Sequence, residues 1–172
     1  MKRGSRGLLL LALAGAWLLP ATALAQANGS CKPVFDAMLK ETVTPHHAVT
    51  TRNGAPAGEL ISTADAMYVQ IKGGWNTSPL TPKRLQAQQQ ENIRNTKTAL
   101  CTALPDDVVD GKAATVYAAH YEQQDLGASD ARVWIAKATG LPLRTDVTLQ
   151  AGERTLVSTR FDYDHITAPI VK

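Results

Sequence analysis

The residues that could do chemistry are few and scattered along the chain. Two of the four histidines, His46 and His47, are adjacent in a segment that we expect to be extended. Neighbouring side chains of an extended segment point to opposite faces, so this pair cannot hold one metal ion. His120, Asp164 and His165 together would suit a metal ion or acid–base chemistry, but we favour ordinary surface or edge positions for them.

No motif in the sequence defines a reaction. There is no nucleophile elbow, no phosphate-binding loop and no C-x-x-C pair, and Asp106, Asp107 and Asp110 lack the alternating ligand spacing of a calcium loop. A serine–histidine–aspartate site stays open, because its members need to meet only in space. We therefore predict no catalytic residue, no metal and no cofactor, and we keep a small hydrolase as the least favoured function.

The N-terminus has the three parts of a secretory signal. A basic stretch that ends at Arg6 precedes an apolar run over 8–19, and Ala23-Leu24-Ala25 then supplies small residues for a signal peptidase. The run is shorter than the roughly 20 apolar residues that span a bilayer, which disfavours an uncleaved anchor. We expect a cleavable signal peptide over 1–25, a single domain over 26–172, and a periplasmic location of the Gram-negative type.

The charge balance changes once the signal is removed. The chain has 18 basic and 15 acidic residues, and three of the basic ones lie in the signal, so the mature chain is formally neutral. The basic isoelectric point is therefore no argument for a nucleic-acid partner, and we predict none. No later segment is long and apolar enough to cross a membrane, so we do not expect a membrane-embedded protein.

The chain has two cysteines, Cys31 and Cys101, which are 70 residues apart. An even pair in an exported protein predicts one disulfide. This bond would tie the first predicted helix to the end of the second. Two free thiols are one alternative, and a lipidated Cys31 is another, although Asn28-Gly29-Ser30 lacks the aliphatic residue expected three places before a lipidated cysteine.

Two helices and about seven strands are expected after the signal. The first helix spans 31–42 with Ser30 as its cap, and the second opens at Thr81-Pro82 and carries Leu85, Ile93 and Leu100 as its few large apolar residues. Period-two alternation with one apolar and one charged face predicts an antiparallel sheet, and hence an α+β fold with helices over the apolar face. The clearest strands lie at 59–63, 66–72, 113–122, 132–137, 141–150 and 154–164.

Three segments carry a family resemblance. They are 133–144, where a Trp-Ile strand leads into a Thr-Gly-Leu-Pro turn, the closing strand with its Ala-Pro over 160–169, and 67–79 with its Gly-Trp and Ser-Pro pairs. In their order along the chain, with 67–79 first, they resemble the periplasmic lipoprotein carriers of the LolA/LolB/LppX-like superfamily, of which the chain would be a divergent member. The resemblance implies an incomplete, strongly curved barrel with helices across its open side and an apolar cavity for acyl chains. It identifies no residue that grips a lipoprotein.

The predicted function is a periplasmic carrier or binding protein for a hydrophobic ligand, either a lipid or the acyl chain of a lipoprotein. The alternative is an envelope module that binds another protein without a ligand. The polar second helix supports the first hypothesis, because it is too poor in large apolar residues to cover an apolar sheet tightly. The cavity candidates are the apolar residues expected on the inward face of one curved sheet: Met67, Val69, Ile71, Val133, Ile135, Leu143, Val147, Leu149, Phe161 and Tyr163.

Overall fold

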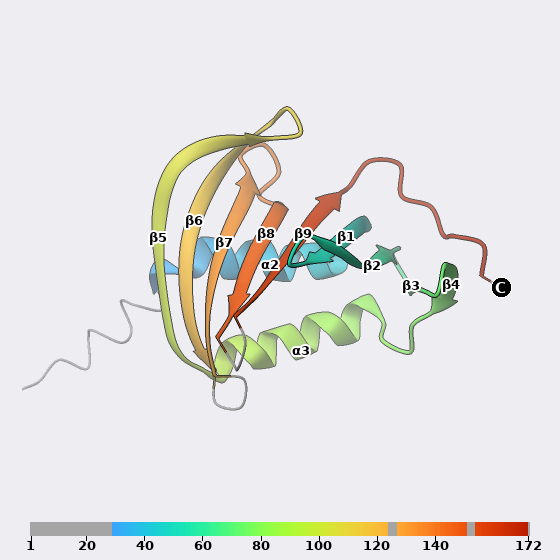
Figure 1. Cartoon of the computed structure of the whole chain (residues 1–172), viewed down its shortest axis with the longest axis horizontal. Coiled ribbons are helices and arrows are strands. Elements are labelled where there is room, and N and C mark those ends of the chain that lie inside the picture. Colours follow the sequence, from blue (N-terminus) through green and yellow to red (C-terminus); the bar gives the residue numbers. More distant parts are fainter. Residues whose placement is uncertain (1–28, 124–126, 151–153, 172) are drawn as a thin grey trace, which may run out of the picture.

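Nine antiparallel strands form one open, curved sheet, and two helices lie along one side of it (Figure 1). The computed structural model describes residues 29–123, 127–150 and 154–171, so the predicted signal peptide lies outside the described residues. The helices are α2 (Lys32–Val43) and α3 (Pro82–Arg94). The strands are β1 (His46–Arg52), β2 (Ala55–Ser62), β3 (Met67–Ile71), β4 (Gly74–Thr77), β5 (Thr96–Val109), β6 (Lys112–Gln123), β7 (Gly127–Ala136), β8 (Pro142–Leu149) and β9 (Thr155–Asp162).

The predicted α+β class is confirmed, with nine strands in the sheet where about seven were expected. The strand order is β4-β3-β2-β1-β9-β8-β7-β6-β5. Two runs of consecutive antiparallel strands, β1 to β4 and β5 to β9, are joined where β9 pairs with β1. Because β4 and β5 stand at opposite ends of this order, the sheet curves without closing into a barrel.

The two faces of the sheet follow from strand register. On one face, Val133 of β7 lies opposite Tyr117 of β6 and Thr145 of β8. Val133 and Ile135 pack against Val34 and Ala37 of α2, so this is the face that the helices cover. We call it the concave face and the opposite one the convex face.

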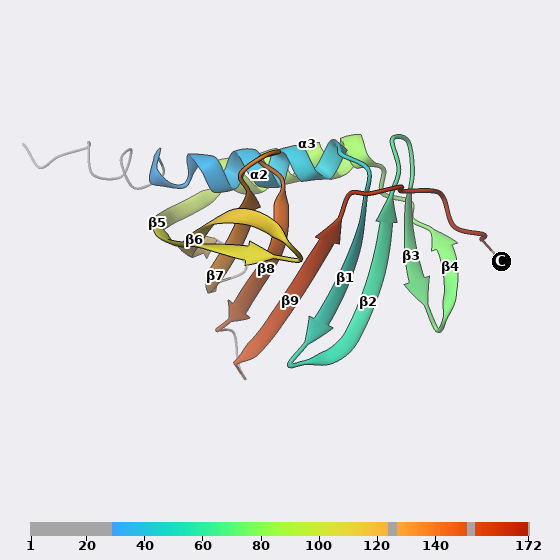
Figure 2. The same cartoon turned by 90° about the horizontal axis from the view of Figure 1, so that it is seen from above.

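The helices cover only part of the concave face. In Figure 2 both helices lie near the end of the sheet where β1 begins and β9 ends, and the opposite ends of these strands project away from them. α3 packs against α2 and makes few contacts with the strands. One end of the sheet therefore has a packed core, and the other end is left open.

The predicted disulfide is confirmed, but its second cysteine lies in a strand. Cys31 and Cys101 are bonded with their Cα atoms 5.0 Å apart, inside the usual range for a disulfide. α3 ends at Arg94 because the β-branched residues that follow it pair with β6. The disulfide therefore ties the start of α2 to β5, and Leu100, expected to be an apolar contact of the second helix, lies in β5 and is 51% exposed.

The two predicted helix caps have different outcomes. Thr81 caps α3, and its hydroxyl oxygen accepts a hydrogen bond from the Arg84 backbone N–H. Ser30 does not cap α2, because Cys31 occupies the cap position without a side-chain hydrogen bond. The Ser30 hydroxyl instead accepts a hydrogen bond from the Cys101 backbone N–H at 3.2 Å, beside the disulfide.

Candidate functional site

The open end of the concave face carries a pocket of about 370 Å³. Leu60, Val69 and Val157 form its apolar wall, and Thr50 and Arg52 line it as well. We call these five residues the distal groove. Arg52 is exposed and the other four are half-buried, so the groove presents apolar surface that no described segment covers completely.

The local backbone explains why the groove is hollow. The β1–β2 register shifts between Thr50 and Thr51, which leaves Ala57 as an extra residue in β2. A bulge of this kind bends the strand and interrupts side-chain alternation. Gly58 lies opposite Thr50 on the concave face and has no neighbour within 4 Å of the place where a Cβ would stand. The bend and the missing side chain together leave space beside Leu60.

Further apolar residues extend the distal groove along the concave face. Val147 of β8 lies opposite Val157 and is half-buried. Ile71 is 55% exposed and Leu149 is 41% exposed. An ordinary core buries such side chains almost completely at high packing density, so this strip leaves apolar surface exposed.

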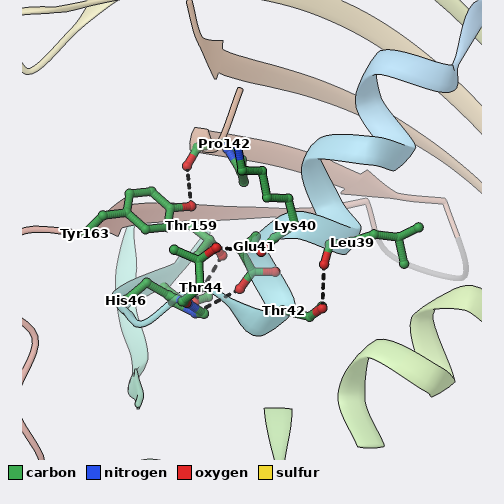
Figure 3. Close-up of polar contacts among 10 residues, drawn as sticks. Leu39, Lys40, Glu41, Thr42, Thr44, His46, Pro142, Thr159 and Tyr163 are labelled. Atoms are coloured by element: carbon green, nitrogen blue, oxygen red, sulfur yellow. Dashed lines mark hydrogen bonds and ion pairs between the residues drawn. The ribbon is translucent and has the colours of Figure 1, made fainter. Parts of the chain in front are cut away.

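A buried polar cluster fixes the C-terminal end of α2 to the sheet (Figure 3). His46 Nε2 lies 2.8 Å from Glu41 Oε1, and Nδ1 lies 2.8 Å from the Thr44 carbonyl oxygen. Both partners are acceptors, so only the protonated ring satisfies the two contacts together. Burial by itself lowers the pKa of His46, but the Glu41 carboxylate and the Thr44 carbonyl raise it above the ordinary value.

Two aromatic residues complete this cluster. The rings of Phe161 and Tyr163 contact the His46 ring, with centroids 5.8 and 6.0 Å away. The Tyr163 hydroxyl donates a 2.7 Å hydrogen bond to the Pro142 carbonyl oxygen. Burial raises the pKa of Tyr163, and the nearby Glu41 carboxylate adds to this effect. The cluster therefore links α2, β1 and β9 and has the character of a structural anchor.

The predicted cavity residues fall into several environments. Val69, Val147, Ile71 and Leu149 lie along the open strip. Val133 and Ile135 are buried and pack against Val34 and Ala37 of α2. Met67 is buried in the cross-strand position beside Ser62. Phe161 and Tyr163 belong to the aromatic cluster around His46.

Leu143 is the residue whose expected face needs correction. It is buried on the convex face, in a second cluster with Trp134, Ala136 and Val116. The β7–β8 register shifts between Trp134 and Ile135. Beyond the shift, simple alternation no longer applies, and Leu143 changes face.

His120 and Asp164 have different partners in the described structure. Among the described residues, no group of three or more histidine, cysteine, aspartate or glutamate side chains could hold a metal ion. His120 Nδ1 lies 2.8 Å from Asp130, and Asp164 accepts a hydrogen bond from Lys112. His46 and His47 contact glutamates on opposite faces of β1, as predicted.

Sequence reasoning did not select Leu60, Val157, Thr50 or Arg52 as cavity candidates. Val157 continues the apolar alternation of the last strand, so its face could be predicted. The other three become neighbours of Val157 and Val69 only through the β9–β1 and β2–β3 pairings. Long-range pairing of this kind leaves no local signal in a single sequence.

Comparison with known proteins identifies the fold. No protein-family model and no curated protein matches the sequence. Among solved structures, the lipoprotein LppX of Mycobacterium tuberculosis matches with a TM-score of 0.50 and 11% identity, over 84% of this chain and 99% of LppX. The chain therefore has an LppX-like fold, which confirms the predicted resemblance at the level of architecture.

Other matches are more distant. The MucA/MucB complex of Pseudomonas aeruginosa gives a TM-score of 0.44 at 15% identity, over 84% of this chain and 59% of that one. A putative outer membrane lipoprotein-sorting protein domain of Vibrio parahaemolyticus gives a TM-score of 0.30 at 8% identity. This match covers 79% of this chain and 93% of that domain. Scores below 0.5 support no conclusion about this chain. No helix within the described residues is long and apolar enough to cross a membrane.

Proposed function

We propose that the chain is an exported binding protein that carries a hydrophobic ligand, a lipid or an acyl chain, in the distal groove. The observation that carries the proposal is the half-buried apolar wall of Leu60, Val69 and Val157 around a pocket of about 370 Å³. An apolar chain laid on this wall leaves water, which is favourable by about 25 cal/mol per Å² of buried surface. The resemblance of the sequence to lipoprotein carriers supports the same function.

The proposal includes export and a single mature domain. The signal-like N-terminus over 1–25 supports translocation, and the disulfide fits an oxidising compartment such as the periplasm. An acyl chain cannot cross that aqueous space exposed, so a protein with an open apolar groove would serve as its carrier. We propose no catalytic step.

Substitution on the two faces of the sheet tests the proposal. Val157→Trp fills the groove from the concave face, whereas Val49→Trp adds the same bulk on the convex face, where Val49 is 40% exposed. The measurements are native mass spectrometry of the mature protein from periplasmic extracts, for co-purified lipid, and titration with the fluorescent fatty acid cis-parinaric acid. We expect lipid and probe binding in wild type and Val49→Trp, and at least a tenfold loss in Val157→Trp.

Two results would contradict the proposal. One is a wild-type protein that neither carries lipid nor binds the probe, which would favour the protein–protein interaction module. The other is equal probe binding by Val157→Trp and wild type, which would place any ligand elsewhere on the molecule. Circular dichroism of both variants checks that the sheet is intact.

A further inference from the structure

Charge is distributed very unevenly between the two faces of the sheet. Strand register places Arg144, Arg160 and Asp162 on the convex face. In the described side chains of β6 to β9 and β1 to β4, the concave face carries only two basic residues, His46 and Arg52, and no acidic one. Since His46 contacts Glu41 of α2, Arg52 is the one charge without a partner on this surface.

Arg52 stands at the mouth of the distal groove. It is the last residue of β1 and lies opposite Val157, so both side chains are on the concave face. Both residues line the pocket together with Leu60 and Val69. A guanidinium group therefore lies next to apolar surface at the open end of the strands.

Three basic residues of the convex face form ion pairs, and a further one, Arg132, lies over the Trp134 ring. Arg144 pairs with Asp146, Arg160 with Asp110 and Lys112 with Asp164. Among the described residues, Arg52 takes part in no ion pair. Glu59 is the acidic residue at the same pocket, but its carboxylate lies 2.9 Å from His47 Nε2 on the other face.

We infer that the ligand is an anionic amphiphile, whose acyl chain lies on Leu60, Val69 and Val157 and whose headgroup binds Arg52. This inference rests on the proposed function. A planar guanidinium offers paired N–H donors that match a carboxylate or a phosphate, and such charge-assisted hydrogen bonds are stronger than neutral ones. The apolar wall alone would bind neutral and anionic chains equally. Arg52 adds a preference for the anion.

Matched probes separate the headgroup from the chain. cis-Parinaric acid and its methyl ester have the same chain with and without a negative charge. Oleoyl glycerol phosphate and monoolein, used as competitors, repeat the comparison for a phosphate. The proteins are the mature wild-type chain, Arg52→Gln, Arg52→Lys and, as a control that removes one charge at the far edge of the sheet, Lys97→Gln.

We expect wild type and Lys97→Gln to bind parinaric acid about tenfold more tightly than its ester at neutral pH and low salt, which is about 1.4 kcal/mol of binding free energy. Arg52→Gln should lose this preference and keep its affinity for the ester. Arg52→Lys should retain part of the preference, and high salt should reduce it because the site is exposed. A larger effect for the phosphate than for the carboxylate would identify a phospholipid-type headgroup, and the reverse would identify a fatty acid.

The experiment distinguishes failure of the headgroup inference from failure of the proposed function. If acid and ester bind equally to wild type, or if Arg52→Gln weakens both to the same extent, the headgroup inference is wrong while the proposed function stands. If neither probe binds wild type, the proposed function fails as well. Because Arg52 is exposed, its replacement should not unfold the chain, and unchanged ester binding verifies this directly.

Discussion

The Ser62 hydroxyl is buried without a hydrogen-bond partner in the described part of the chain, and the residue is only 1% exposed. It lies between His46 and Met67 across the strands. An unsatisfied buried hydroxyl retains its desolvation cost and gains nothing in return. We expect Ser62→Ala to leave the free energy of unfolding unchanged or to raise it by up to about 1 kcal/mol, as measured by urea denaturation of the mature protein.

Thr42 provides the matched control for Ser62. It is also buried, but its hydroxyl donates a 2.7 Å hydrogen bond to the Leu39 carbonyl oxygen. Thr42→Val removes the donor and keeps the shape, so we expect it to lower the free energy of unfolding by about 1 kcal/mol. A clear loss of stability in Ser62→Ala would show that the hydroxyl has a partner after all.

At the residue scale, alternation predicted the faces of most sheet residues because the side-chain period of a strand is two. It placed Val133 and Ile135 on the helix-covered face, where they contact α2. It placed Leu143 on the wrong face because the register shift in β8 leaves no mark in the sequence. It also could not separate packed residues such as Ile135 from exposed ones such as Ile71, because the position of the helices decides between them.

At the scale of elements, α2 is fixed at both ends, by the disulfide at Cys31 and by the ion pair between Glu41 and His46. The pKa of His46 in the folded chain is raised, so the protonated ring contributes stability that is fully present below the unfolded pKa of about 6.5. This contribution is lost as the pH rises through the folded-state pKa. Tyr163 also faces the ring, and its raised pKa keeps the hydroxyl protonated over the same range.

We expect wild type to lose stability as the pH rises above about 6.5 and through the raised pKa of His46, and Glu41→Gln to lose less over the same range. The measurement is urea denaturation across this range. Glu91→Gln is the control, because Glu91 pairs with Arg94 on the exposed side of α3 and contacts no histidine. The same pH profile for Glu41→Gln and wild type would mean that His46 is neutral in the folded protein.

The elements differ in how far the sequence could predict them. The Thr81-Pro82 start of α3 was recognisable because the cap and the proline act locally. Its end was placed near Leu100 instead of Arg94 because the pairing of β5 with β6 overrides the local pattern. The short edge strand β4 pairs only with β3 and with a single bridge at Val171, and it carries little periodicity of its own. Strands defined mainly by their partners are therefore the ones that were not predicted.

At the scale of the whole molecule, most charged residues of the sheet lie on the convex face, which also holds the buried cluster around Trp134. The convex face carries ion pairs such as Arg160 with Asp110, which favour contact with water while contributing little to stability. The concave face has a packed core under α2 and an open groove at the other end. The open sheet accommodates both the packed core and the groove, because its curvature brings β3 and β9 to either side of the groove without closing it.

Ligand binding in this groove should stabilise the whole fold, because every strand that lines it belongs to one continuous sheet. A ligand that binds only the folded chain adds about 2.7 kcal/mol to the free energy of unfolding at a hundred times its Kd. For a domain of this size that corresponds to roughly 5–10 °C in Tm. We expect this rise when delipidated wild type or Val49→Trp is heated with saturating fatty acid, as measured by calorimetry. Val157→Trp should show almost none at the same ligand concentration. An equal rise in all three proteins would mean that the stabilising site lies outside the groove, since only one of the two tryptophans occupies it.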